Sequence, residues 1–282
     1  MRTAFWMAAI LSNLGAHLGA DIMAGKVALD LSVQPLKEDV FKEAKEEVVT
    51  LMAQPMVAPR PATTLTPEIR VRAVHDGHWI AFLLTWADTE RSEAGRLGEF
   101  SDAVALEFPV KEEPLPPIFM GTKDMPVHLL HWRAQYQRDR EKGPPEMKDL
   151  YPNMNPDMYP MDFKDQGKLQ GISEEMREVY SHGKAAGNPQ SYRKESAVDE
   201  IFAEGFGSSS IIHNPQSHGE GRWSDGRWAV VLARPLALVN GSVLVPGQPG
   251  HIGLAVWQGG QDEVGARKCV TMSWITLLMA GE

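Results

Sequence analysis

The sequence of 282 residues contains a single cysteine, Cys269, and this scarcity excludes several kinds of site. An intrachain disulfide needs two thiols, a cysteine-ligated iron–sulfur cluster usually needs four, and c-type haem attachment needs the pair in Cys-x-x-Cys-His. Structural zinc sites built on two or four cysteines are excluded for the same reason. Any cofactor is therefore held without a covalent bond, by side chains such as His, Met, Lys, Asp or Glu.

Basic residues are also scarce, with 28 Lys and Arg against 37 Asp and Glu, which gives a formal net charge of −9. Proteins that bind nucleic acid or anionic lipid normally carry clustered positive charge, so we expect no nucleic-acid partner. Long hydrophobic runs are missing as well. The apolar stretches near the two ends are shorter than the roughly 20 residues that cross a membrane, so the sequence predicts no transmembrane segment.

The first 20 residues have the features of a secretory signal peptide. Arg2 precedes a short apolar run, residues 4–11, and small residues follow it at Gly15, Ala16 and Ala20. An Arg-Arg pair, which marks twin-arginine export, is absent from this region. We therefore expect residues 1–20 to be a signal peptide and residues 21–282 to form one exported domain, for which the length is suitable.

Strand patterns followed by turn dipeptides occur in both halves of the chain. Alternating apolar residues from Glu68, the turn Asp76-Gly77 and an apolar run to Trp86 predict a β-hairpin, and residues 224–234 repeat the same order. Further short strands are predicted at 242–245, 251–257 and 269–278. Hairpins with apolar faces close by packing one sheet on another, so the predicted fold is mainly β, an antiparallel β-sandwich.

Helices are expected to be few, short and peripheral. Residues 36–52 carry many charges and a pattern typical of a solvated helix. Residues 143–194 are rich in proline, which excludes long helices, and predict a long irregular insertion with a short helix at 173–181.

Met120 is a candidate metal ligand. It lies in Phe119-Met120-Gly121, after a proline-rich stretch, where the glycine permits a close backbone approach and the thioether is free to bind a haem iron. Methionine is also a common filler of irregular gaps in a core, and the sequence contains 14 of them. Both interpretations of Met120 remain open from position alone.

His128 and His131 are three residues apart, and Lys268 precedes the last predicted strand. On a helix the two histidines share a face and can bind one metal or haem, whereas on a strand they point to opposite faces. A structural or hydrogen-bonding role is the favoured interpretation of both. By itself, Lys268 is typical of a solvated cation at the edge of a strand.

Seven groups of segments together resemble a known family, the haem-b-binding gamma subunit of ethylbenzene dehydrogenase, dimethylsulfide dehydrogenase, selenate and chlorate reductases and related nitrite oxidoreductases. The matches follow in order from about residue 54 to the C-terminus. The segments are VRAVHDG (71–77) with LTWADT (84–89), FSDAVALEFP (100–109), FMG (119–121) with PV (126–127) and WRA (132–134), AEGFGS (203–208), WAVVLAR (228–234), AVWQG (255–259) and KCVTMSW (268–274).

The resemblance implies a β-sandwich that holds one non-covalent haem b, with a methionine and, in ethylbenzene dehydrogenase, a lysine as axial ligands. Met120 matches the first position and Lys268 the second, with His131 or His128 as the fallback for the lysine. A thioether favours Fe(II), and a lysine amine binds a metal only when it is deprotonated, which burial promotes. With both axial positions filled, such an iron transfers electrons and does not activate a substrate.

The resemblance also implies partners. Family members associate with an iron–sulfur (beta) subunit and a molybdopterin-containing catalytic (alpha) subunit, and exchange electrons with a soluble cytochrome c in the periplasm. The competing hypothesis is a binding module without a redox centre, a β-sandwich that binds a ligand or carbohydrate through exposed tryptophans such as Trp79, Trp223 or Trp228.

Overall fold

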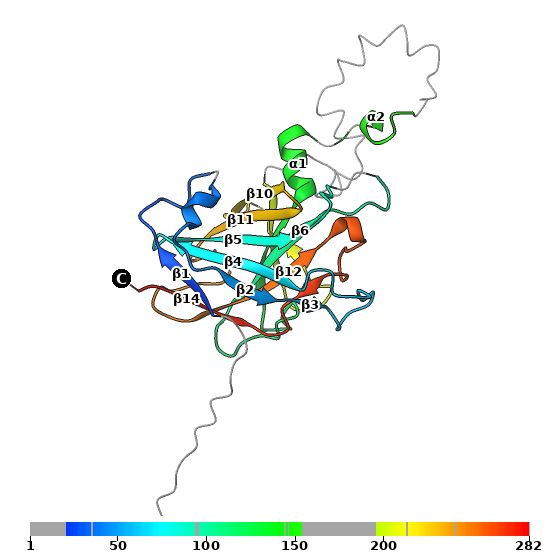
Figure 1. Cartoon of the computed structure of the whole chain (residues 1–282). Coiled ribbons are helices and arrows are strands. Elements are labelled where there is room, and N and C mark those ends of the chain that lie inside the picture. Colours follow the sequence, from blue (N-terminus) through cyan, green and yellow to red (C-terminus); the bar gives the residue numbers. More distant parts are fainter. Residues whose placement is uncertain are drawn as a thin grey trace, which may run out of the picture.

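The computed structural model describes residues 21–281 except 35, 94, 95, 144, 146, 154–195, 213 and 240. The predicted signal peptide, the predicted helix at 173–181 and most of the insertion at 143–194 lie outside these residues. Strands dominate the described part (Figure 1). Its helical elements are short: α1 (Ala134–Lys142), α2 (Met147–Leu150) and the 3₁₀ segments η1 (Glu38–Phe41) and η3 (Gly259–Gln261). None of these is long and apolar enough to span a membrane.

Fourteen strands are connected by hydrogen bonds within the described residues. They are β1 (Ile22–Lys26), β2 (Glu47–Thr50), β3 (Met52–Ala53), β4 (Glu68–His75), β5 (Trp79–Ala87), β6 (Ala103–Pro109), β7 (Val127–Arg133), β8 (Val198–Ala203), β9 (Ser210–Ile211), β10 (His218–Ser224), β11 (Arg227–Pro235), β12 (Gly250–Trp257), β13 (Cys269–Val270) and β14 (Ile275–Met279). The main path runs in the order β10-β11-β5-β4-β1-β14-β12-β6-β7-β8-β9.

Strand β12 joins two layers. Its first residues, Gly250 to Ile252, pair with β14, and its last, Gly253 to Trp257, pair with β6. We call β10, β11, β5, β4, β1 and β14 the first layer, and β12, β6, β7, β8 and β9 the second layer. All pairings are antiparallel except those of β1, which runs parallel to β4 and β14. The prediction of a mainly β, sandwich-like fold with few short helices is confirmed.

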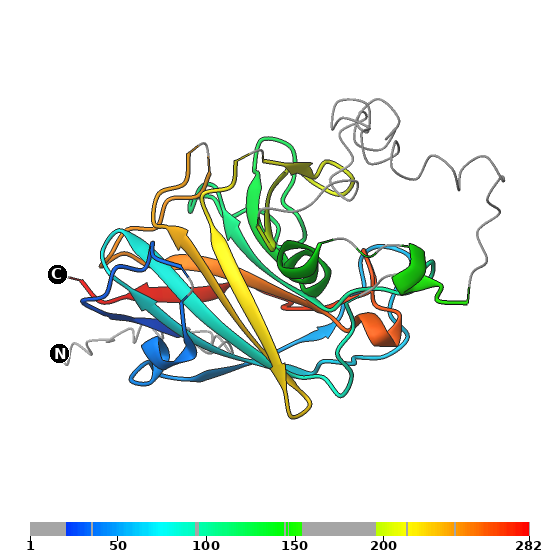
Figure 2. The same cartoon turned by 90° about the horizontal axis from the view of Figure 1, so that it is seen from above.

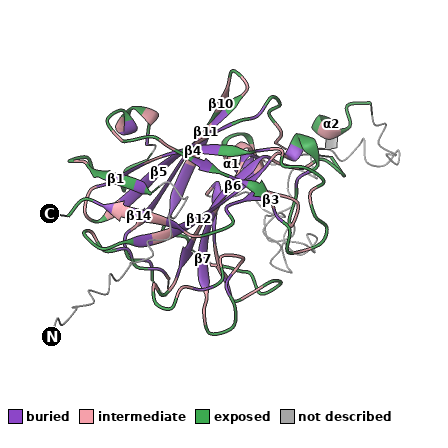
Figure 3. Cartoon of the chain, turned by 60° about the horizontal axis from the view of Figure 1, so that its bottom comes forward, coloured by how far each residue is buried: buried purple, intermediate pink, exposed green. Residues whose placement is uncertain are grey.

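Large apolar side chains pack between the layers. Trp228 of β11 meets Trp132 of β7 edge-on at 5.0 Å between ring centroids, and Phe82 of β5 lies 6.1 Å from Phe108 of β6. All four are buried, and the buried residues follow the strands while exposed residues follow the loops (Figure 3). Burying each such side chain stabilises the fold by about 1.5–3 kcal/mol, so this interior holds the layers together.

Both predicted hairpins are present, and the turn residues explain them. In the β4–β5 hairpin, the Asp76 carboxylate accepts hydrogen bonds from the N–H groups of His78 and Trp79 at 2.8 and 2.7 Å. In the β10–β11 hairpin, Asp225 and Gly226 both have positive φ, 52° and 71°. Two left-handed residues make the tight turn whose twist suits antiparallel strands.

The predicted helix over residues 36–52 is wrong. The structure has the short η1 there, followed by β2, which pairs with β4 from Glu47 to Thr50. Val49 of β2 is buried, whereas Val48 and Thr50 on either side of it are exposed. This alternation is that of a strand with one face on the core, and pairing with β4 supplies that core contact. Charge pattern alone therefore misidentified the element.

Two predicted strands are also corrected. Residues 242–245 form no strand and make a single bridge, between Ala237 and Val243. The predicted strand at 269–278 is two strands, since β13 pairs with β12 and β3 while β14 pairs with β1 and β12. The chain breaks between them because these two pieces belong to different parts of the folded sheet.

Candidate functional site

A cavity of about 350 Å³ lies on the outer face of the second layer. We call it the inner cavity. Strands β6, β7, β8 and β12 supply its floor, and loops supply its walls. Its lining includes Ala105, Glu107, Phe119, Met120, Leu129, His131, Arg133, Ala255, Trp257 and Lys268. Its size and its mostly apolar lining with a few polar groups are typical of a site for a small molecule or cofactor.

Small side chains form part of the cavity floor. Ala105 of β6 is paired with Ala255 of β12, and the next outward-facing pair joins Glu107 to Gly253. Residues two apart on a strand share a face, so these positions all lie on the side away from the core. The short side chains leave space above the sheet for a flat molecule.

The loop before β7 presents Met120 to the cavity. Met120 has a φ of 66°, in the left-handed region that a residue with a side chain rarely adopts. Its N–H donates to the Glu107 carboxylate at 3.2 Å and its carbonyl accepts from the N–H of Gly205 at 2.8 Å. At Gly121, a Cβ atom would lie 2.6 Å from the Met125 carbonyl oxygen, so the chain needs glycine there. A strained conformation held from both sides is typical of a functional position.

Lys268 reaches the same cavity from the segment before β13. Its Nζ lies 4.8 Å from the centroid of the Trp257 ring, and its carbonyl accepts from the N–H of Gln54 at 3.0 Å. Burial lowers the pKa of the Lys268 ammonium, and the nearby Glu107 carboxylate opposes this shift. Lys268 is thus half-buried in a cavity, which corrects its interpretation as a solvated strand-edge cation.

Glu107 is a further residue of this site, one that the sequence pattern alone does not identify. Burial raises the pKa of its carboxyl to about 8, against the opposing effects of the Lys268 charge and the Met120 N–H. A signal was present in the sequence, because Glu107 is the one charged residue in the apolar strand from Ala103 to Pro109. Its outward position in the alternation places it in the cavity and not in the core.

The two histidines separate, as expected for a strand. His131 lines the inner cavity and stacks on Trp257 with 4.8 Å between ring centroids. Burial, followed by the charges of Arg133 and Lys268, holds the pKa of His131 well below its usual value. His128 faces the other way, is fully buried and lies 3.7 Å from the Glu200 carboxylate. The structure therefore brings together Met120, Lys268 and His131, and excludes His128.

The donor atoms of this site suit a haem iron. A thioether, a buried amine and a neutral imidazole are the ligand types that haem proteins or related iron sites use. Within the described residues, no group of three or more His, Cys, Asp or Glu side chains forms a site for a bare metal ion. The small-residue floor, the apolar walls and these donors together fit a flat, iron-containing macrocycle.

The family model described as ethylbenzene dehydrogenase matches residues 38–269, a range that includes Met120 and Lys268. The chain belongs to the ethylbenzene dehydrogenase family. This confirms the resemblance found in the sequence.

Two relatives of this family member are named for subunits of reductases. A protein of Haloferax mediterranei, named for the haem subunit of a respiratory nitrate reductase, is 22% identical over 249 residues, which are 87% of this chain and 68% of that protein. The gamma subunit of chlorate reductase from Ideonella dechloratans is 25% identical over 240 residues, which are 83% of this chain and 75% of that protein.

Solved structures resemble this family member only loosely. A carbohydrate-binding module of family 9 from Caldicellulosiruptor kristjanssonii, in complex with glucose, gives a TM-score of 0.44 at 8% identity, covering 93% of this chain and 96% of that chain. The same module in complex with cellotriose gives the same TM-score at 9% identity, with 93% and 94% covered.

The tryptophans proposed for a binding module are not arranged as an exposed platform. Trp228 is buried between the layers. Trp223 is partly buried against the same core, and its Nε1 donates to the Asp88 carbonyl at 3.0 Å. Trp79 is half-buried with its ring 5.4 Å from that of His218. In this member of the ethylbenzene dehydrogenase family, all three side chains serve packing.

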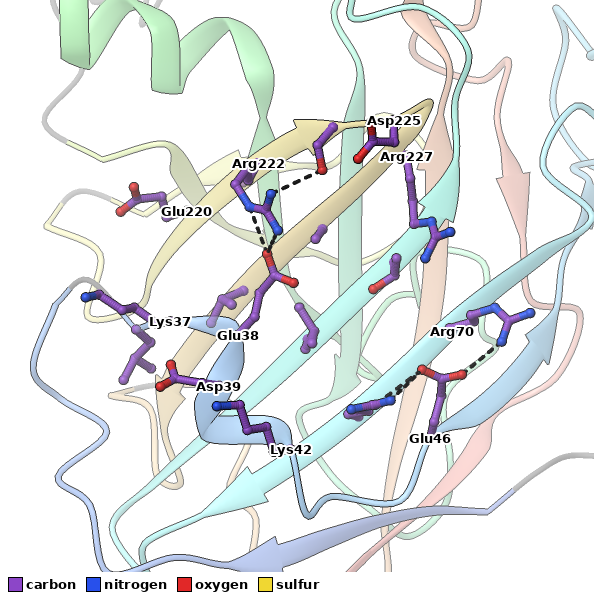
Figure 4. A pocket seen from close by; sticks show the side chains of 18 residues that line it. Lys37, Glu38, Asp39, Lys42, Glu46, Arg70, Glu220, Arg222, Asp225 and Arg227 are labelled. Atoms are coloured by element: carbon purple, nitrogen blue, oxygen red, sulfur yellow. Dashed lines mark hydrogen bonds and ion pairs between the residues drawn. The ribbon is translucent and has the colours of Figure 1, made fainter.

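A larger depression of about 920 Å³ lies on the outer face of the first layer, and we call it the charged groove (Figure 4). The Arg222 guanidinium pairs with Glu38 at 2.5 Å, and Glu46 pairs with Arg70 at 2.9 Å and with Arg72 at 3.1 Å. Several of its charges are thus paired at the surface. None of the predicted ligands lines it.

Proposed function

We propose that this chain is an electron-transfer subunit that binds one non-covalent haem b in the inner cavity, with Met120 and Lys268 as the axial ligands. One observation carries the proposal. Two residues that are distant in sequence, each matched to a ligand position of the family, line a single apolar cavity. A chance pair of a methionine and a lysine has no reason to meet away from solvent, where the lysine loses hydration.

The chain's own residues supply the binding and the orientation. The hydrogen bonds of Glu107 and Gly205 to the backbone of Met120 fix the loop from which the thioether projects. Lys268 approaches from the segment before β13, which is anchored to Gln54. The mostly apolar walls contain few groups that compete for an iron ligand position. When bound, haem supplies a one-electron couple whose potential depends on the axial ligands, hydrogen bonds and burial.

The charge state of Lys268 supports its role. An ammonium has no lone pair to donate, so ligation requires loss of its proton. Burial lowers the pKa of Lys268 and so reduces the free-energy cost of this proton loss, while Glu107 opposes the shift. Glu107, whose own pKa is raised, lies close enough to influence the same proton.

His131 is the alternative ligand, since it lines the inner cavity and its low pKa keeps the imidazole neutral. Its Nδ1 lies 3.4 Å from Nη2 of Arg133, and its ring is stacked on Trp257. Lys268 matches the ligand position that the family resemblance implies, so we favour Lys268.

We further propose that the chain works within a periplasmic molybdenum oxidoreductase. It would relay electrons between an iron–sulfur subunit, beside a molybdopterin-containing catalytic subunit, and a soluble cytochrome c. The names of the relatives, a haem subunit of a nitrate reductase and a gamma subunit of chlorate reductase, support an assembly of this kind.

The visible absorption spectrum of the purified chain, oxidised and reduced with dithionite, tests the proposal, followed by a pyridine haemochrome assay. We expect one acid-extractable b-type haem per chain and a sharp low-spin reduced spectrum, because both axial positions are filled. A colourless chain that takes up no added haemin would contradict the proposed function.

A further inference from the structure

A second cavity of about 630 Å³ adjoins the inner cavity and opens more widely to the surface. We call it the outer cavity. Its lining includes residues of the loop before β6, such as Leu97, which is almost fully exposed, and Phe100. The two cavities share four lining residues, which are His131, Arg133, Trp257 and Gly265. Any molecule in the inner cavity therefore has one edge toward these residues.

Arg133 is the cation at this junction. It is the last residue of β7 and faces outward with His131. Its Nη1 donates to the Tyr136 hydroxyl at 3.0 Å, and its guanidinium carbon lies 4.9 Å from the centroid of the Tyr136 ring. Tyr136 is buried on α1, so it fixes the position of the guanidinium.

The remaining edge of this guanidinium has little to bind. Nη2 makes only a long contact of 3.4 Å with Nδ1 of His131, and the buried Nε has no hydrogen-bond partner among the described residues. Nε and Nη2 are the two donors that bind a carboxylate in the bidentate, fork-like arrangement. A buried Nε–H without a hydrogen-bond partner is costly, and arginine keeps its charge at all relevant pH values.

A second guanidinium contacts Phe100, a residue that lines the outer cavity. Arg267 lies over the ring of Phe100, at 5.7 Å from its centroid, and its buried Nε also lacks a hydrogen-bond partner in the described part of the chain. The acidic residues of the outer cavity are otherwise engaged: Glu99 pairs with Arg96, and Glu263 accepts from the N–H of Gln258. Among the described residues, neither of these carboxylates forms an ion pair with Arg133.

We propose that Arg133 binds a carboxylate side chain of the haem and so turns the acidic edge of the macrocycle toward the outer cavity. This inference rests on the proposed function, since it assumes that the inner cavity holds haem. Haem b carries two propionate groups on one edge, and the rest of its rim is apolar. The inner cavity has a similar asymmetry, because its walls are mostly apolar and a guanidinium lies at the end that adjoins the outer cavity. Arg133 is then a positioning residue, which decides which edge faces the opening.

The test compares two porphyrins on the full chain, ferric protoporphyrin IX and its dimethyl ester, which lacks the carboxylate charges. Each is titrated into the apo-protein and followed by Soret absorbance. The wild-type chain is expected to prefer the free acid by on the order of ten- to a hundredfold, the range of one hydrogen-bonded charge pair. Arg133→Gln is expected to lose most of that preference, and Arg133→Lys to keep part of it.

The matched control is Arg227→Gln, which alters an exposed arginine that lines the charged groove on the opposite layer. It should retain the wild-type preference. Equal binding of acid and ester by the wild-type chain overturns the inference, as does an unchanged preference in Arg133→Gln. Failure of the wild-type chain to bind either porphyrin overturns the proposed function itself. The quantity compared is the ratio of the affinities for acid and ester within each variant. A variant that binds both porphyrins more weakly therefore keeps the same ratio and is not mistaken for a loss of preference.

Discussion

The charged side chains on the outer faces of the two layers differ in their exposure and in their pairing. On the first layer, the arginines of the charged groove lie at the surface, where Arg222 pairs with Glu38 and Arg70 with Glu46. On the second layer, the inner cavity contains Lys268 and Glu107 with shifted pKa values. Exposed ion pairs contribute only about 0–1 kcal/mol, whereas a poorly paired charge in an apolar cavity is costly. This difference is what we expect if the second face binds a ligand, as we propose.

Two views at right angles show how the strands of the two layers are arranged. In Figure 1 strands β4, β5 and β11 lie side by side, and Figure 2 shows the same assembly from above with α1 beside the strands. The loops that contain Phe119, Met120 and Phe206 form walls of the inner cavity over β6 and β12.

The largest effect is expected when a bulky side chain is placed in the inner cavity and, separately, in the charged groove. Ala105→Leu places a larger side chain on the floor of the inner cavity, and Ala229→Leu makes the same change on the floor of the charged groove. Haem affinity, measured by titration of the apo-protein, is expected to fall more than about a hundredfold for Ala105→Leu, about 2.7 kcal/mol, because the macrocycle and the leucine compete for space. Affinity should not change for Ala229→Leu. Equal effects of the two variants would break the comparison.

The next test removes one lysine from each face. Lys268→Ala is expected to convert the low-spin spectrum to a high-spin one and to weaken haem binding by about tenfold or more, because an axial ligand is lost. Lys42→Ala removes an exposed lysine of the charged groove and should change neither property. Absorption spectra of both variants, oxidised and reduced, supply the measurement. An unchanged low-spin spectrum in Lys268→Ala would remove this residue from the ligand assignment and favour His131.

The smallest expected effect concerns a buried acidic pair away from both faces. Burial, and next the charge of Asp102, raise the pKa of Asp88 from 3.8 to about 7, and burial also raises that of Asp102. The folded state therefore binds more protons than the unfolded state between about pH 4 and pH 7, so the free energy of unfolding should fall as pH rises through this window.

Replacement of one acid tests this pH dependence. Asp88→Asn keeps an acceptor for the Glu90 N–H and removes the charge. Near pH 8 it should raise the free energy of unfolding by about 1 kcal/mol, with a flatter dependence on pH, as measured by urea denaturation. Asp225→Asn, in the exposed turn of the β10–β11 hairpin, is the control and should follow the wild-type curve. A wild-type curve that rises between pH 4 and pH 7 would contradict the assignment. Neither variant should change the affinity for haem, because neither residue lines the inner cavity. This result would support a haem site confined to the second layer.

Local pattern predicted the hairpins because their determinants are local. The Asp-Gly turns specify their own backbone conformation, and alternation then places one side of each strand in the core. The same reasoning failed for residues 36–52, where pairing of β2 with β4 decided the structure. It failed again at 269–278, because nothing in the residues themselves states that β13 and β14 pair with different strands.

The candidate site was predicted in part. The resemblance to the gamma-subunit family identified Met120 and Lys268, which the structure places in one cavity, while their role as ligands stays a prediction. The spacing of His128 and His131 left two possibilities, and the strand placed only His131 in the cavity. Glu107 and Arg133 were missed, because their significance depends on burial and on neighbours from other strands.

The sequence by itself determined the class of fold and excluded attachment of a cofactor through a Cys-x-x-Cys pair, because composition and alternation are properties of the chain alone. Only the tertiary structure decided which side chains meet. Met120, Lys268 and Glu107 come from separate segments, and their proximity follows from the fold of β12 across both layers and from the loops over β6 and β7. The physical reason is that desolvation and the distance between charges shift pKa values and create a binding site, and both are fixed only by long-range packing.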